Sequence, residues 1–342
     1  MSKKISIQNF IFLLLISIIA IFFLFNAQKL VGDHFYYDSL TLKYFLSLPI
    51  QENLKLITES SYAATAFIYQ FFGIDNNFNN NQQIILNLFI YMFCVFLFLI
   101  KKEAQLNNLF NISLLLLVTV FYSVYLGQIS KETLVVLMMI IIVTFNGKYN
   151  LISILLMLLY GFFVREYWLL IALLFVFNHI ILKKNNKILK VILLNFLMIT
   201  ILSFLHILMF GELLTSYRYE VNEYRMYAGE VNTILLNPYN AVNVISDLGN
   251  FIYGFTNLIL PIDGISSTNE LAYYVWILLL TFISIKKLRK ANFNDTIVPI
   301  SLLISFICVQ SIFEPDMGSV LKHQIGLFPL YLKIISLREK EK

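Results

Sequence analysis

The chain has 342 residues, of which 59% are hydrophobic and only 13% are charged, and its formal net charge is +5. A soluble domain is nearer 45–50% apolar and about 25% charged, so the composition excludes an ordinary soluble protein and favours a membrane protein. The net charge carries little information until the charges are assigned to sides of a membrane. Both cysteines, Cys94 and Cys308, lie inside apolar runs. They are predicted to be small buried residues, without a disulfide framework.

Apolar runs of membrane-spanning length recur along the whole chain. Because about 20 apolar helical residues cross a hydrocarbon core of about 30 Å, we predict an all-α, polytopic integral membrane protein with a single transmembrane domain over 1–342. The first run resembles a signal peptide, but no small-x-small cleavage site follows it, so an uncleaved helix is expected. About ten transmembrane helices are expected, at 9–27, 82–100, 109–126, 132–146, 149–164, 167–182, 190–210, 271–286, 296–313 and 321–337.

Two longer loops are expected on the outer side, at 28–81 and 211–270. Each contains an apolar stretch with polar or glycine interruptions, 60–73 and 242–262. We interpret both stretches as interfacial or re-entrant helices.

The distribution of charge supports this arrangement. With ten spans and both termini in the cytoplasm, the inner segments hold 17 of the 25 Lys and Arg residues and 4 of the 20 acidic residues. The outer segments then hold the other 8 basic and 16 acidic residues. Lysine and arginine concentrate on the cytoplasmic side of membrane proteins. Counting 242–262 as a span would move the basic loop 286–290 outward, against this rule.

Every polar cluster that stands out then lies on the outer face. These clusters are GDHFYYD (32–38), GQISKE (127–132), VREYW (164–168), YRYEVNEYRMY (217–227) and EPDMGSVLKH (314–323). The inner loops are short lysine-rich connectors. The sequence contains neither a P-loop nor GxGxxG, so no nucleotide cofactor is expected.

Two of these clusters have the pattern of an anion site at the start of a helix. In GQISKE, Ser130 can cap the helix at 132, with Lys131 at its mouth and Glu132 placed to hold the lysine. The alternative is a capped helix with a snorkelling lysine.

In EPDMGSVLKH, Asp316 or Ser319 can cap the last helix, which would place Lys322 and His323 in its first turn. Cations there oppose the helix dipole, so a basic first turn predicts an anion site. The alternative is a solvated loop with an interfacial lysine.

Arg165 and Glu166 interrupt the nearly continuous apolar stretch 149–182. A charge near lipid is costly and usually faces a cavity or a partner, which favours a site role for Arg165 over a tight interfacial turn.

Arg218, Asn222 and Arg225 share one face of a predicted helix ringed by tyrosines. Arginine suits phosphate contacts. The alternative is an amphipathic helix on lipid headgroups.

The early cluster GDHFYYD supplies Asp33, His34 and Asp38. A carboxylate with an imidazole could act as a general base, and the alternative is a solvated loop within an aromatic interface belt. No two histidines stand at metal-ligand spacing, so no metal site is predicted.

Together these motifs resemble those of the Wzy-type polymerases of O-antigen, capsule and exopolysaccharide repeat units. The similarity lies in an outer SKE at a helix start, an arginine at a mid-chain helix break, paired arginines in a long loop, EPDxGSxx[KR]H before the final helix and an early GDxxYYD. It spans most of the chain as scattered short motifs. Lys322 departs from it, because an arginine often stands there in that family.

The resemblance implies a function on the outer face of the bacterial inner membrane. Polyprenyl-pyrophosphate-linked oligosaccharide units would be joined there, with the growing chain moving from its carrier onto the non-reducing end of the next unit. Departure of the lipid pyrophosphate needs cations, and a carboxylate or His323 can deprotonate the acceptor hydroxyl. Membrane lipids, a chain-length regulator and a flippase are the expected partners, and no nucleic acid is expected. The expected catalytic residues are Arg165, His323, Asp33 and Glu314, and the expected substrate-binding residues are Lys131, Glu132, Tyr167, Arg218, Arg225, Asp316, Ser319 and Lys322.

Three other functions remain open at this point. A GT-C-type glycosyltransferase shares many spans and an early outer acid, for which Asp33 or Asp38 could serve. A lipid-linked oligosaccharide flippase would need charges within the bundle and two pseudo-symmetric halves, and no repeat is evident. A ligase or acyltransferase is the third, although no HxxxD pair supports the acyl version.

Overall fold

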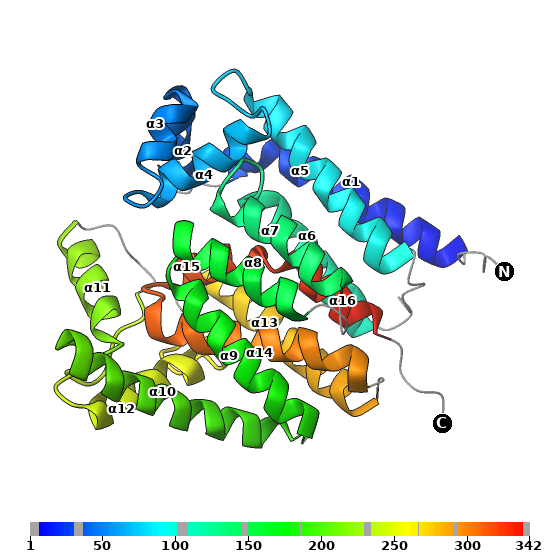
Figure 1. Ribbon diagram of the computed structural model, residues 1–342. Coiled ribbons are helices and arrows are strands. Elements are labelled where there is room, and N and C mark those ends of the chain that lie inside the picture. Colours follow the sequence, from blue (N-terminus) through cyan, green and yellow to red (C-terminus); the bar gives the residue numbers. More distant parts are fainter. Residues whose placement is uncertain are drawn as a thin grey trace. The chain divides into compact units, whose positions relative to one another are not determined.

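The computed structural model describes residues 7–30, 37–100, 109–145, 150–184, 187–228, 234–265, 267–290 and 293–337, and helices joined by turns and loops make up these residues (Figure 1). Within these ranges there is no strand, and one isolated antiparallel bridge joins Ile234 and Asp316. The predicted all-α class is therefore confirmed.

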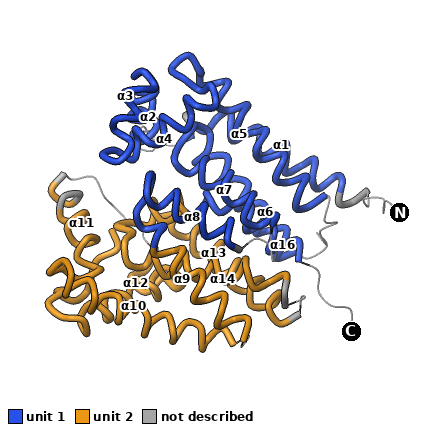
Figure 2. The backbone as a smooth tube through the Cα atoms, in the orientation of Figure 1, with its two compact units in different colours: residues 1–169, 324–342 blue, residues 170–323 orange. Residues whose placement is uncertain are grey.

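The chain divides into two compact units, residues 1–169 with 324–342 and residues 170–323 (Figure 2). The single transmembrane domain expected over 1–342 stays a prediction. The helices that lie wholly in the first unit are α1 (Ile7–Leu30), α2 (Tyr37–Ser47), α3 (Ile50–Lys55), α4 (Ser61–Phe71), α5 (Asn80–Val95) with its π-helical continuation η2 (Phe96–Ile100), α6 (Leu109–Tyr125), α7 (Lys131–Thr144), α8 (Asn150–Phe163) and α16 (Phe328–Ser336). The remaining helices are α9 (Tyr167–Lys184), α10 (Ile188–Phe210), α11 (Ser216–Ala228), α12 (Val244–Ile259), α13 (Thr268–Lys290), α14 (Phe293–Phe313) and α15 (Met317–Ile325).

Six helices of the described chain are long and apolar enough to cross a membrane. They cover Phe10–Ala27, Asn80–Ile100, Tyr167–Lys184, Ile188–Phe210, Glu270–Arg289 and Asp295–Phe313. Two further apolar helices, Leu109–Tyr125 and Leu151–Phe163, are shorter. The membrane class of the fold follows from these helices, whereas the expected count of about ten spans and the orientation of the chain stay predictions.

The last expected span, 321–337, is not one helix. It is replaced by the nine-residue helices α15 and α16, which are separated at Gly326 and Leu327. Pro329 occupies the second position of α16, where the missing N–H of proline costs nothing because no intrahelical acceptor is available. In a continuous helix the same proline would clash with the preceding turn, which explains the break.

The core of the first unit is formed around α16. This helix is buried along most of its length and packs against α6, α7 and η2. The ring of Phe328 lies 4.6 Å from that of Tyr122 and 5.3 Å from that of Tyr91, between centroids. Cys94 is a free, buried residue in this unit, as predicted. Helix α1 packs along α6 and α5, at the surface of the same core.

The second unit is built around α14, which is 94% buried along its apolar window and packs against α12 and α13. Cys308 on α14 is free and buried, as predicted. A chain of buried amides also reaches α14: Asn195 donates to Asn178 at 2.6 Å, and Asn178 donates to the Ser305 hydroxyl at 2.8 Å. Hydrogen bonds of this kind join helices that have no water to bind.

Both stretches interpreted as interfacial or re-entrant are helical. Helix α4 covers most of 60–73, and α12 covers most of 242–262 after a capping box formed by Asn243 and Ser246. Their placement at the membrane surface stays a prediction.

Candidate functional site

The start of α7 forms the first part of the candidate site. Ser130 occupies the predicted cap position of α7, but its hydroxyl makes no capping hydrogen bond. The turn is instead held through backbone carbonyls. The Tyr69 hydroxyl donates to the Ser130 carbonyl at 2.7 Å, and the Tyr160 hydroxyl donates to the Lys131 carbonyl at 3.2 Å.

Lys131 is held by groups from α4. Its ammonium donates to the Ser61 hydroxyl at 2.7 Å and lies 3.4 Å from the centre of the Tyr62 ring. A cation over an aromatic face at this distance gains a favourable interaction without losing its charge. The Tyr62 hydroxyl in turn donates to the Asp38 carboxylate on α2. Lys131 is therefore a cation held on a fixed aromatic support.

Arg165 lies at the turn between α8 and α9 and forms an ion pair with Glu132. The arginine side chain is 12% exposed and the glutamate side chain 3%. Arg165 also donates from Nη1 to the Tyr167 hydroxyl at 3.1 Å. The sequence did not predict this ion pair, since Glu132 was expected to hold Lys131. Arg165 thus lies at a tight turn and has polar partners, and its role in a substrate site stays a prediction.

These contacts join residues of three separate sequence motifs, 32–38, 127–132 and 164–168, with the start of α4. We call the set formed by Asp38, Ser61, Tyr62, Lys131, Glu132, Arg165 and Tyr167 the cation cluster. Burial raises the pKa of Tyr62 well above its usual value, and the neighbouring Asp38 carboxylate raises it further. The charges of Arg165 and Glu132 also act on this pKa, in opposite directions. Tyr62 therefore remains a protonated hydrogen-bond donor within the cluster.

Three members of this cluster were not recognised as site residues from the sequence, although Asp38 was considered as a base. Ser61 and Tyr62 lie in the stretch 60–73, which carries no charge and was interpreted only as an interfacial helix. The available signal was the polar SSY at its start, where Ser60 caps α4 by accepting from the Ala63 N–H at 3.4 Å.

In the second unit, the EPDMGS turn is organised by Asp316. Its carboxylate accepts from the Ser319 N–H and from the Ser319 hydroxyl, both at 2.8 Å. Helix α15 therefore begins at Met317, and Lys322 and His323 lie in its last turn. The predicted basic first turn, and the anion site at a helix start that followed from it, are wrong. The helix dipole favours cations at this end.

Glu314 and His323 form a buried acid–imidazole pair. His323 Nδ1 and Glu314 Oε1 lie 2.5 Å apart, and the two side chains are 15% and 4% exposed. Two of the residues expected to be catalytic are thus brought together by the turn between α14 and α15. A carboxylate on one imidazole nitrogen orients the ring and leaves Nε2 as the other proton-carrying position.

Arg218 is completely buried and bound by protein acceptors. Its Nε donates to Asn237 Oδ1 at 2.7 Å, its Nη1 to the Ser311 carbonyl at 2.8 Å and its Nη2 to the Asn250 carbonyl at 3.3 Å. Burial lowers the pKa of Arg218 to about 10. This placement supports a structural role, and the substrate contact predicted for Arg218 gains no support from it.

The tight packing around this arginine requires a glycine on α12. A Cβ at Gly254 would lie 2.5 Å from the Ser311 carbonyl oxygen and 2.7 Å from Arg218 Nη1. Arg218 therefore locks α11, α12 and α14 together.

Two expected site residues lie outside what the structure describes. Asp33, with its neighbour His34, is outside the described residues, and Arg225 is on α11 but its side chain is not described. The structure brings Lys131, Glu132, Arg165 and Tyr167 together in the first unit. In the second unit, Asp316 contacts Ser319 and Glu314 contacts His323, with Lys322 on the same helix as His323. That all five polar clusters lie on one outer face stays a prediction.

The described part of the chain contains no group of three or more His, Cys, Asp and Glu side chains placed to hold a metal ion. Comparisons with protein-family models, with curated proteins and with solved structures find no match for this chain. The functional argument therefore depends on the residues and their geometry.

Proposed function

We propose that this protein is a polymerase that joins polyprenyl-pyrophosphate-linked oligosaccharide repeat units on the outer face of the bacterial inner membrane. The observation that carries the proposal is the cation cluster, in which Lys131 and Arg165 are held by neighbours on other helices. Its motifs are those through which the sequence resembles the Wzy-type polymerases.

The reaction breaks the bond between the anomeric carbon of the donor sugar and its pyrophosphate and forms a glycosidic bond to an acceptor hydroxyl. Negative charge develops on the departing lipid pyrophosphate. Fixed cations aimed at such charge are commonly the largest contribution to catalysis. In this proposal Lys131 and Arg165 supply the positive charge. Tyr62 holds Lys131 in place, and Glu132 holds Arg165 in place.

The acceptor hydroxyl must lose its proton to a base. The Asp38 carboxylate in the cation cluster is one group suited to this role, and the Glu314–His323 pair in the second unit is the other. Polymerisation measured in His323→Ala and Asp38→Asn, at normal protein levels, identifies the base, because only the variant that lacks the base should lose activity.

The glycan ladder of a deletion strain tests the proposed function. If the protein is a polymerase, the strain accumulates single repeat units on the occupied carrier, and the wild-type gene restores the ladder. A ladder of normal length in the deletion strain would contradict the proposal.

Asp38 supports a second candidate, a GT-C-type glycosyltransferase that transfers single sugars from a lipid carrier. Such an enzyme uses an acid shortly after its first helix, and the structure places Asp38 in the cation cluster through Tyr62. The same strain separates the two functions, because loss of a glycosyltransferase removes the complete repeat unit.

A further inference from the structure

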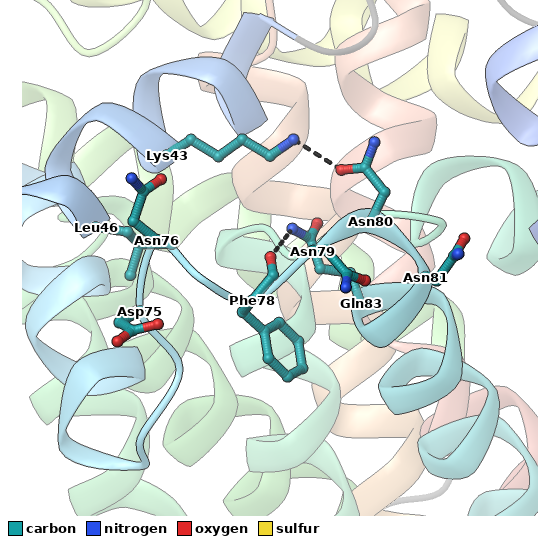
Figure 3. Close-up of a pocket in the computed structure, with 9 residues that line it drawn as sticks. All are labelled: Lys43, Leu46, Asp75, Asn76, Phe78, Asn79, Asn80, Asn81 and Gln83. Atoms are coloured by element: carbon teal, nitrogen blue, oxygen red, sulfur yellow. Dashed lines mark hydrogen bonds between the residues drawn. The ribbon is translucent and has the colours of Figure 1, made fainter.

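A polar pocket of about 490 Å³ lies in the first unit, between α2 and the loop that leads into α5 (Figure 3). Its volume falls within the range of roughly 300–1,000 Å³ that is typical of ligand sites. All of its lining residues except Gln83 lie in the segment 28–81 that we predict to be an outer loop. It is lined by Lys43, Leu46, Asp75, Asn76, Phe78, Asn79, Asn80, Asn81 and Gln83.

The lining is dominated by side-chain amides. Seven of the eight residues from 76 to 83 are Asn or Gln, and five of the seven line the pocket. Each amide offers both a donor NH₂ and an acceptor oxygen, which matches a ligand that presents many hydroxyl groups. Phe78 adds an apolar, half-buried side chain to the lining.

The pocket carries no net charge. Its one cation, Lys43, donates to Asn80 Oδ1 at 2.9 Å, and its one carboxylate, Asp75, accepts from the Asn77 N–H at 2.9 Å and from the Asn77 amide at 3.2 Å. A pyrophosphate would meet a single cation here, whereas the cation cluster offers two, Lys131 and Arg165. The lining favours a neutral, hydroxyl-rich ligand.

Two of the lining amides have unused hydrogen-bonding capacity. Asn76 and Asn81 are exposed and make no side-chain hydrogen bond with the residues that the structure describes. By contrast, Asn79 is engaged in the capping box of α5 with Gln82. The open amides are thus the groups that a ligand would meet first.

We propose that this pocket binds a neutral oligosaccharide segment. The inference rests on the proposed function, under which the segment belongs to the repeat unit that is being polymerised. The cation cluster would hold the pyrophosphate, and the amide pocket would hold sugars.

Gln83 connects the pocket to the cation cluster. This residue is 1% exposed; its Nε2 donates to the Phe78 carbonyl at 3.1 Å, and its Oε1 accepts from the Ile129 N–H at 3.3 Å (the first bond is drawn in Figure 3). Ile129 immediately precedes Ser130 and Lys131. These two bonds tie the pocket loop, at Phe78, to Ile129 just before α7. A sugar held in the pocket would therefore lie at a fixed position relative to Lys131 at the start of α7.

The test compares two variants of the purified full-length protein. Asn76→Ala/Asn81→Ala removes the two open amides, and the control Gln51→Ala removes an exposed amide of α3 that does not line the pocket. The probe is the oligosaccharide released by mild acid from the polymer of the source cells, and binding is measured by titration calorimetry in detergent. The double variant should bind at least roughly tenfold more weakly than the wild type, because two hydrogen bonds are lost. The control should bind within about twofold of the wild type.

Absence of binding by the wild-type protein, or equal affinities of wild type, double variant and control, would overturn the inference, and so would equal losses in the double variant and the control. Polymerisation by Arg165→Ala, measured in parallel, separates this outcome from failure of the proposed function. If Arg165→Ala is inactive but the double variant binds normally, the pocket inference fails alone. If Arg165→Ala polymerises normally while the double variant loses binding, the pocket stands and the catalytic proposal fails.

Discussion

Replacement of Arg165 by alanine should affect stability and activity separately, because the arginine neutralises a buried carboxylate. Glu132 is only 3% exposed and is ion-paired with Arg165. Removing one partner of a buried ion pair typically costs about 3–5 kcal/mol. Arg165→Ala should therefore lower the thermal unfolding midpoint of the detergent-solubilised protein by several degrees. It should also lower the polymerisation rate about a hundredfold, since loss of one charge-stabilising contact costs roughly 3 kcal/mol.

The double variant Arg165→Ala/Glu132→Gln separates these effects. It removes the buried charge, so the unfolding midpoint should return most of the way to the wild-type value, whereas activity should stay low. Arg165→Lys keeps the charge but loses the planar fork, so it should restore activity only in part. Wild-type activity in Arg165→Ala, at normal protein levels, would refute the reasoning and leave Arg165 as a structural anchor of the α8–α9 turn.

Three further predictions concern the rest of the molecule. Arg218→Ala and Gly254→Ala should each lower the thermal unfolding midpoint. Arg218→Ala should reduce the free energy of unfolding by about 3 kcal/mol, because buried acceptors lose a charged donor. Neither variant should change the pH profile of activity, and normal midpoints would contradict the structural role. The pKa of Tyr62 is raised in the folded state, so its contribution to stability is complete below the usual tyrosine pKa of about 10 and falls as the pH rises above it. Tyr62→Phe should therefore show a shallower loss of stability above pH 10 than the wild type, and identical slopes would contradict this. For topology, a cysteine introduced at Arg289 should resist an impermeant thiol reagent in intact cells, because the loop 286–290 is predicted to be cytoplasmic. Arg289 is the position of choice because it is exposed, whereas Lys287 is only 3% exposed and would resist labelling on either side of the membrane.

The sequence predicts the helical class and the long apolar helices well, because apolar runs such as 190–210 leave few other structures in a membrane. It predicts the short helices less well. The expected span 321–337 was chosen for membrane length, although Gly326 and Pro329 mark a break that the structure contains. That choice also placed Lys322 and His323 at the wrong end of their helix.

The candidate site was predictable in its residue types and not in its pairings. Glu132 and Arg165 are far apart in the sequence, and nothing in their spacing indicates that they pair with each other. Ser61 and Tyr62 support Lys131 from an uncharged stretch, where no charge pattern indicates a site. The buried position of Arg218 depends on Asn237 and Gly254, which are distant from it in the chain, so a helical pattern alone cannot separate a structural arginine from a binding one.

The most direct measurement of the proposed function uses the purified protein in lipid nanodiscs, supplied with polyprenyl-pyrophosphate-linked repeat units and no nucleotide sugar. The products are separated on a gel and probed for the carrier. The predicted result is a ladder of multiples of the repeat unit together with release of free polyprenyl pyrophosphate. Both the ladder and the release should be lost in Arg165→Ala. If the folded wild-type protein leaves the single repeat units unchanged, or transfers only single sugars, the proposal is contradicted.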